Sequence, residues 1–584
     1  MNGFFSRYYY VIGLATLLSS GCLAGFLFYK YYLTHEPISI QEEILIIEES
    51  KENNTTPETL PSPATSPSEE AENPTKTKEG SIPEVVIAEQ QESVTPGPEN
   101  IIPPEENNMP PLDPKAYCKG FSSLTAECSL KNLTIDGIIP TWLHGSLMAV
   151  GPAKFELNNS RVKHWLEGFS MVHQFSFENG KVSYNNRFLE TTYYCQSIEK
   201  GKFSNATCAV DPNASYFAKL AAALSKSNDR PPYDNTNVNI INYGNCCIAL
   251  TETPHMIFCD MRDLKTTGMC AYNDELEPHV SSAHPFIDPK TGELYNIATT
   301  FAKRSSYTVY KMNPKTLCRI PLTTIKASYP SYIHSFGVSN RYIIVTEVPY
   351  VVSPYDLVMS GKPYIENFNW KPKQKTKMTV ISKATGAIVQ TYELDPFFTF
   401  HHINAHDTGE QIFVDLIALP DASHMKSLYM NQIKQNKNIT FPQGTIMRIA
   451  LDLNSSKAKS IPLSPVKIEM PRINPEYMTK SYRYIYGENS SHPQAYYDQI
   501  VKIDLKAHTV KTWHHSHCYV TEPIFVPKPN GLKEDDGVVL SIILDMRSST
   551  SSLIILDGPS LELVAKVRLP HHIPFTTHSN YFPK

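Results

Sequence analysis

The sequence lacks the short motifs that mark several large classes of enzyme. It has no G-x-S-x-G nucleophile elbow, no Walker-type phosphate loop, no G-x-G-x-x-G dinucleotide fingerprint and no H-E-x-x-H zinc helix. It also has no C-x-x-C pair, so its eleven cysteines do not suggest a zinc ribbon. The formal net charge of -5 gives no reason to expect nucleic acid as a partner. These absences argue against hydrolase, nucleotide-binding and zinc-ribbon classes.

An uncharged, apolar run occupies residues 8–29. Its length is close to the roughly 20 residues that a helix needs to cross a bilayer core, and tyrosines flank both ends. A cleaved signal peptide would have a shorter apolar region, and a lipoprotein site at Cys22 would not be followed by more apolar residues. We therefore expect residues 1–35 to be an uncleaved, single-pass membrane anchor. Arg7 and Lys30 nearly cancel as orientation signals, so the side of the membrane stays open.

Residues 36–113 are rich in Pro, Glu, Ser and Thr, contain few aromatics and show no sustained period. Such a segment buries too little apolar surface to offset the entropy lost on ordering. We expect it to be a disordered linker that separates the anchor from the rest of the chain.

The cysteines and glycosylation sequons leave the cellular compartment open. Ten cysteines follow Cys22, and an even number would suit disulfides outside the cytosol. Sequons point the same way, but both features arise readily by chance in a chain of this length. The sequons include those at Asn132, Asn205, Asn213, Asn438 and Asn489.

Residues 114–584 carry the pattern of an all-β domain with a few helical insertions. Runs of β-branched and aromatic residues alternate with turn signals, for example at residues 174–184, 239–245 and 339–347. The strongest signal is the Asn-Gly pair at residues 179–180, which predicts a hairpin. Helical periods are scarce, and residues 215–225 give the clearest one. A length of about 470 residues suits a propeller of four-stranded blades better than a single sandwich.

Histidines next to apolar residues occur at several expected strand ends. His401 and His402 lie in a stretch that also holds His406, and His284, His334 and His578 lie in similar surroundings. Imidazole suits iron, zinc, copper and nickel. For any one of these histidines a hydrogen-bonded core residue is the simpler interpretation, so the argument for metal depends on the set.

Ten short motifs follow one another along the domain. They are Gly145-Ser146-Leu147, Gly151-Pro152, Glu167-Gly168, Met171-Val172-His173, Thr251-Glu252-Thr253-Pro254, His284-Pro285, His334-Ser335-Phe336-Gly337, Phe400-His401-His402-Ile403-Asn404, Glu522-Pro523-Ile524-Phe525-Val526-Pro527 and Glu534-Asp535-Asp536-Gly537-Val538-Val539-Leu540-Ser541. In this order they resemble the carotenoid cleavage oxygenases, and most of all their animal branch of β-carotene oxygenases and the retinoid isomerohydrolase. The similarity runs from about residue 117 to residue 582, and the anchor and linker lie outside it.

The resemblance implies a seven-bladed β-propeller with one ferrous ion, Fe(II), held by four histidines. The positions that match the family's ligands are His284, His334, His401 and His578, with His402 as a neighbour. Three further positions match glutamates that orient those histidines: Glu252, Glu469 and Glu522.

The implied activity is a dioxygenase reaction, in which dioxygen cleaves a carbon–carbon double bond of a carotenoid or apocarotenoid. The products would be carbonyl compounds of the retinal or apocarotenal type. Because such a substrate dissolves in the lipid bilayer, a membrane anchor makes physical sense. Residues 215–225 have two open interpretations: a helix that dips into the bilayer or a plain packed helix.

Two alternatives remain open at this point. One is a redox-neutral retinyl ester isomerohydrolase on the same scaffold, which would consume no dioxygen. The other is a non-catalytic, membrane-tethered propeller that binds a lipid, which the loss of a histidine would have favoured. None of the four histidines is lost.

Overall fold

The computed structural model describes residues 115–204, 233–244, 246–360, 362–435, 439–492 and 495–584. All the described residues belong to one compact unit. The expected anchor (1–35), the expected linker (36–113) and the expected helix at residues 215–225 lie outside the described residues. Within the described ranges, no helix is long and apolar enough to cross a membrane.

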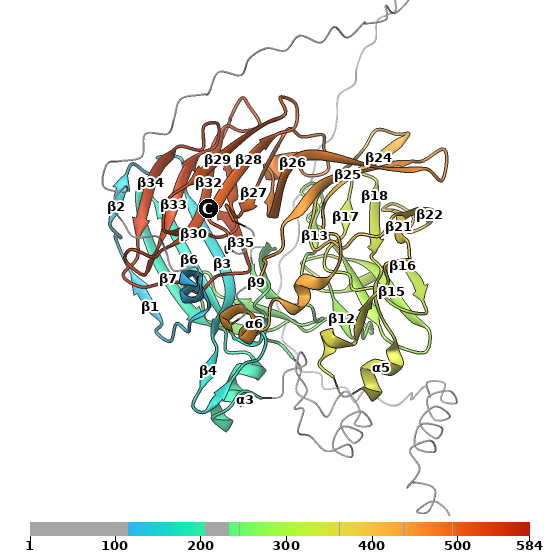
Figure 1. Ribbon diagram of the computed structural model, residues 1–584, viewed down its shortest axis with the longest axis horizontal. Coiled ribbons are helices and arrows are strands. Elements are labelled where there is room, and N and C mark those ends of the chain that lie inside the picture. The colour runs from blue at the N-terminus through green and yellow to red at the C-terminus, as the bar shows by residue number, and fades with distance from the viewer. Residues whose placement is uncertain (1–114, 205–232, 245, 361, 436–438, 493–494) are drawn as a thin grey trace, which may run out of the picture. The chain divides into compact units, whose positions relative to one another are not determined.

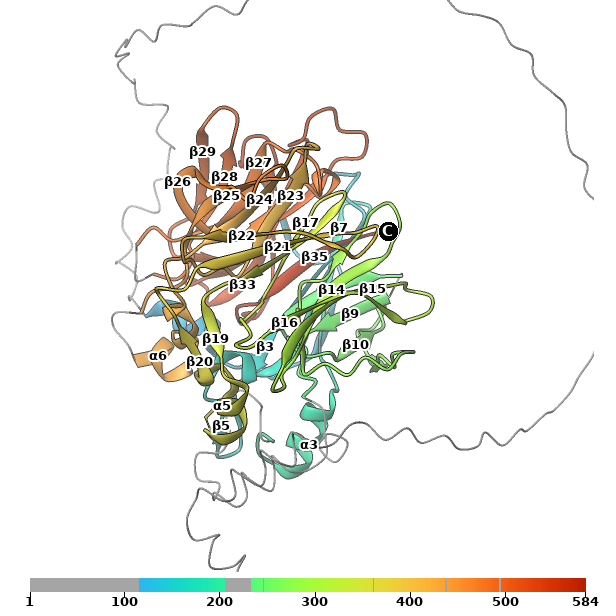
Figure 2. The same cartoon turned by 90° about the vertical axis from the view of Figure 1, so that its right-hand side faces the viewer.

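Strands dominate the described part of the chain, as the sequence predicts. The helices are short and, in both views, α3 and α5 lie at one side of the sheets (Figures 1 and 2). The α-helices are α3 (Thr192–Lys200), α5 (Pro354–Met359) and α6 (Met430–Gln435), and short 3₁₀ helices cover Ala116–Phe121, Trp165–Glu167, Tyr364–Asn367, Ser423–Lys426 and Pro475–Tyr477.

One sheet joins the beginning and the end of the described chain. In the order β1-β7-β6-β3-β35, the C-terminal strand pairs antiparallel with an early one, so that Val150 faces His578 (Figure 1). This pairing fixes the start of the last strand, where a candidate ligand lies. The strands are β1 (Cys128–Leu130), β3 (Gly145–Lys154), β6 (Phe169–Glu178), β7 (Lys181–Phe188) and β35 (His578–Pro583).

Three further sheets follow one another along the chain. Each consists mainly of neighbouring antiparallel strands joined by short connections. Their strands are β8 (Asn239–Tyr243), β9 (Cys246–Leu250), β10 (Met256–Cys259) and β11 (Thr266–Met269); β12 (Val280–Ser281), β13 (Phe286–Ile287), β14 (Leu294–Thr300), β15 (Ser305–Met312) and β16 (Arg319–Ala327); β17 (Gly337–Val338), β18 (Tyr342–Glu347), β21 (Thr376–Ser382) and β22 (Ile388–Leu394).

The two remaining large sheets have seven and six strands. In the seven-stranded sheet, β26 pairs with β25 through its first part and with β27 through its last residues. The strands are β23 (His402–Asp407), β24 (Gln411–Ala418), β25 (Gly444–Asp452), β26 (Ala458–Arg472), β27 (Tyr484–Asn489), β28 (Gln499–Asp504) and β29 (Thr509–His514); then β2 (Ile135–Gly137), β30 (Cys518–Val520), β31 (Ile524–Pro527), β32 (Gly537–Asp545), β33 (Thr550–Asp557) and β34 (Leu563–Arg568). Two small pairs are β4 (Glu156–Leu157) with β5 (Ser160–Arg161) and β19 (Tyr350–Val352) with β20 (Phe368–Trp370).

The hairpin predicted at the Asn-Gly pair is confirmed. Glu178 pairs with Lys181, and the two residues between them have φ values of 52° for Asn179 and 72° for Gly180. Two positive φ angles in a two-residue loop match the right-handed twist of the flanking strands, and Asn and Gly tolerate them best.

The sequence did not reveal helix α3, which is nine residues long. Its signals are local, because Thr191 caps the N-terminus by accepting a hydrogen bond from the Tyr194 backbone N–H, and Gly201 ends the helix with φ 62°. The helix is too short to show a clear apolar period, so its caps alone define it.

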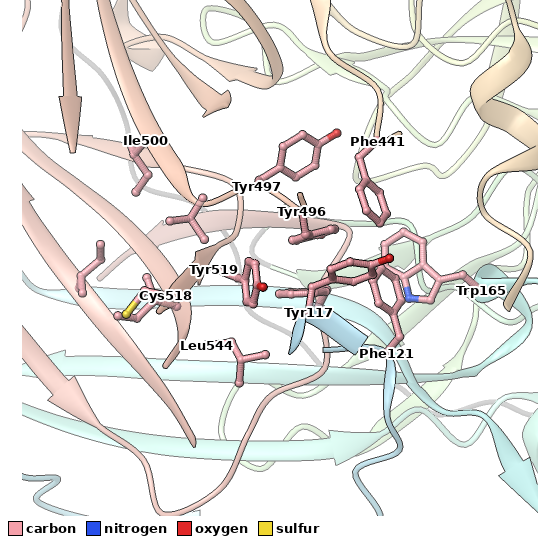
Figure 3. Packing of buried hydrophobic residues seen from close by; sticks show 14 of the residues in the cluster. Tyr117, Phe121, Trp165, Phe441, Tyr496, Tyr497, Ile500, Cys518, Tyr519 and Leu544 are labelled. Carbon is pink, nitrogen blue, oxygen red and sulfur yellow. The ribbon is translucent and has the colours of Figure 1, made fainter. Parts of the chain in front are cut away.

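An aromatic cluster forms one part of the core, where Tyr117, Phe121 and Trp165 come together with residues from the C-terminal third of the chain (Figure 3). Phe575 is fully buried there and stacks on Tyr496, with ring centroids 3.8 Å apart. Aromatic pairs contribute beyond the area they bury, so this cluster ties the first described residues to the last strands.

Candidate metal centre

Four histidines from four different sheets converge at one point. The ligand atoms of His284, His334, His401 and His578 all lie within 4.8 Å of one another. Nε2 of His284 and Nε2 of His334 are 3.0 Å apart. No other group of three or more potential metal ligands occurs in the ranges that the structure describes.

Each of these histidines lies at or near the beginning of a strand. His284 lies between β12 and β13, and His334 lies three residues before β17. His401 immediately precedes β23, and His578 is the first residue of β35. The sequence-based expectation that they lie at strand ends is confirmed, and the sheets explain how residues almost 300 positions apart meet at one point.

Three of the four imidazoles are hydrogen-bonded to glutamates. Nδ1 of His334 lies 2.6 Å from Oε1 of Glu252, and Nδ1 of His401 lies 2.6 Å from Oε2 of Glu469. A carboxylate oxygen only accepts hydrogen bonds, so Nδ1 of each of these imidazoles carries the proton. Nε2 is then unprotonated and keeps a free lone pair.

His578 makes the third of these histidine–glutamate contacts. Nδ1 of His578 lies 2.9 Å from Oε1 of Glu522. His284 is held differently, because its backbone N–H donates to Oγ of Ser282, which in turn donates to the carbonyl oxygen of His334. In the described residues, no carboxylate pairs with the His284 imidazole. The structure thus brings together all seven residues that the resemblance selected.

The two other histidines of the 401–406 stretch lie apart from this cluster. His402 uses both ring nitrogens elsewhere, with Nδ1 2.8 Å from Oγ of Ser335 and Nε2 2.9 Å from Oγ1 of Thr346. His406 stacks on the ring of Phe413. Successive side chains of a strand point to opposite faces, so a pair of adjacent histidines supplies only one residue to the cluster.

Burial keeps three of the clustered imidazoles neutral, those of His284, His401 and His578. It lowers the pKa of His284 and His401 well below the ordinary value, and it lowers that of His578 to about 4 although Glu522 favours the charged form. Neutral imidazole is the form that ligates a metal ion.

The surroundings shift the pKa values of two of the glutamates in opposite directions. Burial raises the pKa of Glu469 to about 7. Burial also acts to raise the pKa of Glu522, but contacts with Arg472 and His578 outweigh it and lower the value to about 2. Glu522 is therefore a firmly ionised partner for His578.

The residues present fit a single transition-metal ion. Nε2 of His401 is buried and has no hydrogen-bond partner, which is costly for a polar atom unless a ligand satisfies it. Nε2 of His284 lies 3.0 Å from Nε2 of His334, so the two ring nitrogens converge on the same small volume. Four neutral nitrogen donors suit iron, zinc, copper or nickel.

Sequence reasoning missed two residues that support the glutamates. The Tyr332 hydroxyl donates to Oε1 of Glu252 at 2.5 Å, and Nε of Arg472 donates to Oε1 of Glu522 at 2.9 Å. Tyr332 is only two residues from His334, and Arg472 is three residues after Glu469 in β26. Neither position carries a distinctive pattern, so only their neighbourhood in sequence could have suggested them.

Comparison with known families agrees with this site. The family model described as Retinal pigment epithelial membrane protein matches residues 121–583. The chain therefore belongs to this family, the carotenoid cleavage oxygenases.

Individual relatives are similar over most of the domain. A mitochondrial carotenoid-cleaving dioxygenase of Macaca fascicularis is 28% identical over 511 residues, which cover 76% of this chain and 91% of that protein. A carotenoid isomerooxygenase of Galleria mellonella is also 28% identical, with 77% of this chain and 93% of that protein covered. Among solved structures, a cobalt-substituted apocarotenoid oxygenase of Synechocystis is 24% identical with a TM-score of 0.71, and covers 81% of this chain and 99% of that chain. The likeness shows that the fold is shared.

Replacing Arg472 with methionine is expected to weaken metal binding about 10- to 100-fold. The substitution removes the positive charge that lowers the pKa of Glu522, and burial then favours the neutral acid, which is a poorer acceptor for Nδ1–H of His578. Competition with a chelator of known affinity measures the change.

Arg448→Met is the matched control for this variant. Arg448 forms a similar ion pair with the buried carboxylate of Asp415, but neither residue contacts the histidines or their glutamates. The control should lower stability and leave metal affinity unchanged. Equal losses of metal affinity in the two variants would refute a specific role for Arg472.

Proposed function

We propose that the protein is an Fe(II)-dependent dioxygenase that cleaves a carbon–carbon double bond of a carotenoid or apocarotenoid. The observation that carries the proposal is the convergence of His284, His334, His401 and His578 with one ligand atom each. The metal, when bound, supplies the redox chemistry that activates dioxygen, whose two oxygen atoms replace the double bond with two carbonyl groups. Family membership and the names of the relatives support the same reaction class.

The protein itself orients the metal ligands and shields the site from water. Glu252, Glu469 and Glu522 each hold an imidazole by Nδ1 and so direct the other ring nitrogen toward the metal. The four ligands carry no negative charge, so they leave the charge of a ferrous ion uncompensated. His401 and His578 are buried and His284 and His334 are partly buried, which limits the access of bulk water to the reacting atoms.

A small cavity beside Glu252 has a mixed lining. Phe301, Tyr332, Tyr364, Ile297 and Ile333 line it together with Glu252, three serines and a threonine, and its volume of about 10 Å³ has room for roughly one water molecule. It marks a space next to the metal ligands, and the position of a polyene against the metal would determine which bond is cleaved.

We propose the seven-bladed propeller as the arrangement of the sheets. In the part of the chain that the structure describes, six sheets have four or more strands, and the seven-stranded one divides at β26, whose two parts pair with different neighbours. That division makes seven blades, with the histidines at strand beginnings near the axis. We further propose that residues 1–35 anchor the enzyme in a membrane, which would spare a bilayer-soluble substrate a passage through water.

The test is product analysis with iron-loaded, detergent-solubilised full-length protein. β-Carotene, an apocarotenal and a retinyl ester are each incubated in air, and the products are separated by chromatography with mass detection. A pair of shorter carbonyl compounds supports the oxygenase, and their masses identify the bond. Isomerised retinol without cleavage would instead establish the isomerohydrolase, and unchanged substrates would favour a lipid-binding role.

A further inference from the structure

Two buried cysteines lie in direct contact on adjacent strands. Cys247 of β9 and Cys259 of β10 are opposite each other in the antiparallel ladder, and their Sγ atoms are 2.7 Å apart. Both side chains are buried. Of the nine cysteines that the structure describes, these are the two whose sulfur atoms meet.

The backbone already has the spacing that a disulfide needs. Directly opposed residues of an antiparallel pair have Cα atoms about 4.5–5.5 Å apart, inside the range of about 4.4–6.8 Å found for disulfides. Two unbonded sulfur atoms do not normally approach to 2.7 Å, whereas forming the bond requires only a small further approach. We propose that Cys247 and Cys259 form a cross-strand disulfide in this protein.

The segment that the bond would close includes Glu252. Residues 247–259 form a hairpin, and Glu252 lies in its turn, between the end of β9 at Leu250 and the start of β10 at Met256. The Glu252 carboxylate holds Nδ1 of His334. A covalent bond between the two strands therefore restricts fraying of the hairpin whose turn presents this carboxylate.

The bond forms during oxidative folding. The hydrogen bond to Cys259 and burial raise the pKa of the Cys247 thiol well above its ordinary value, so in the folded protein it is a poor nucleophile. Before the strands are buried, a disulfide oxidant such as oxidised glutathione can react with one thiol, and the second thiol then displaces it. The two thiols lose two protons and two electrons, and the oxidant's disulfide is reduced to two thiols.

Mass spectrometry tests the bond directly. The full-length protein is produced with folding in an oxidising compartment, alkylated in denaturant without reductant, and digested with chymotrypsin, which cuts after Leu250 and Phe258 and so separates the two cysteines. The expected result is one linked pair of peptides, about 2 Da lighter than the two thiol peptides together, that separates on reduction. Cys270, which is buried without such a contact, should be fully alkylated.

Two variants assign the pair. Cys246 is the exposed neighbour of Cys247, so Cys246→Ser should retain the link and Cys247→Ser should lose it. The Cys247→Ser and Cys259→Ser double variant should melt about 3–6 °C lower than the oxidised protein. Full alkylation of Cys247 and Cys259, or a link through Cys246, would overturn the proposal. None of these readouts depends on the proposed metal or reaction.

Discussion

The His401→Ala variant is expected to lose its bound iron and at least about 100-fold of its cleavage activity. His401 presents a buried Nε2 with no hydrogen-bond partner to the cluster, and Glu469 holds the other nitrogen. Removal of this ring leaves three nitrogen donors, and the buried Glu469 carboxyl loses its imidazole partner but keeps the hydrogen bond from the Met470 backbone N–H. Iron is measured by mass spectrometry of the purified protein, and activity by the amount of cleaved product.

His402→Gln is the matched control, one residue away in the same stretch. His402 already uses both ring nitrogens in contacts with Ser335 and Thr346, so it has none left for a metal ion. We expect this variant to lose about 1–3 kcal/mol of stability from unsatisfied hydroxyl partners while it keeps its iron. Iron loss in the His402 variant together with full iron content in the His401 variant would reverse the assignment.

The Phe575→Ala variant is expected to lose about 3–5 kcal/mol of its free energy of unfolding. Phe575 is 1% exposed, stacks on Tyr496 at 3.8 Å and meets the edge of Phe121 at 5.2 Å. Its ring also fills the space above Gly120, where a Cβ would lie 2.2 Å from the Phe575 ring. Truncation leaves a cavity between the first described residues and the strand that begins at His578. The shift of the denaturant midpoint measures the loss.

Leu532→Ala removes apolar atoms from a site that is 96% exposed, and so serves as the control for Phe575→Ala. We expect a change within about 0.5 kcal/mol, because an exposed side chain gains little from burial and leaves no cavity. A Phe575 variant as stable as the Leu532 variant would mean that the aromatic cluster contributes little to the fold.

Local signals in the sequence predict the strands well. The hairpin around Asn179 and Gly180 follows from turn chemistry, and the strand at Tyr342–Glu347 follows from its β-branched residues. The sequence did not predict helix α3, because a nine-residue helix with few buried residues shows almost no hydrophobic periodicity.

The candidate site depends on information that spacing alone does not contain. His284 and His578 are almost 300 residues apart, and only the order of motifs shared with a known family selects them from the other histidines. The structure adds what that resemblance lacks: the Nδ1 contacts, the ion pair of Arg472 with Glu522, and the separate hydrogen bonds that set His402 apart.

The pairing of Cys247 with Cys259 is likewise invisible in the sequence. The two cysteines are twelve positions apart, and the spacing matches no metal-binding or redox motif. Only the register of β9 against β10 places them opposite each other. Contacts across a ladder depend on where the turn falls, and the turn around Glu252 has no strong Asn-Gly type signal.

Dioxygen uptake during turnover tests the central claim most directly. Iron-loaded protein is mixed with an apocarotenal in a closed cell, dioxygen is followed with an electrode, and the cleaved product is counted in the same sample. The account predicts one molecule of dioxygen consumed for each double bond cleaved, and no uptake by His401→Ala. Turnover of substrate without dioxygen consumption would contradict an oxygenase.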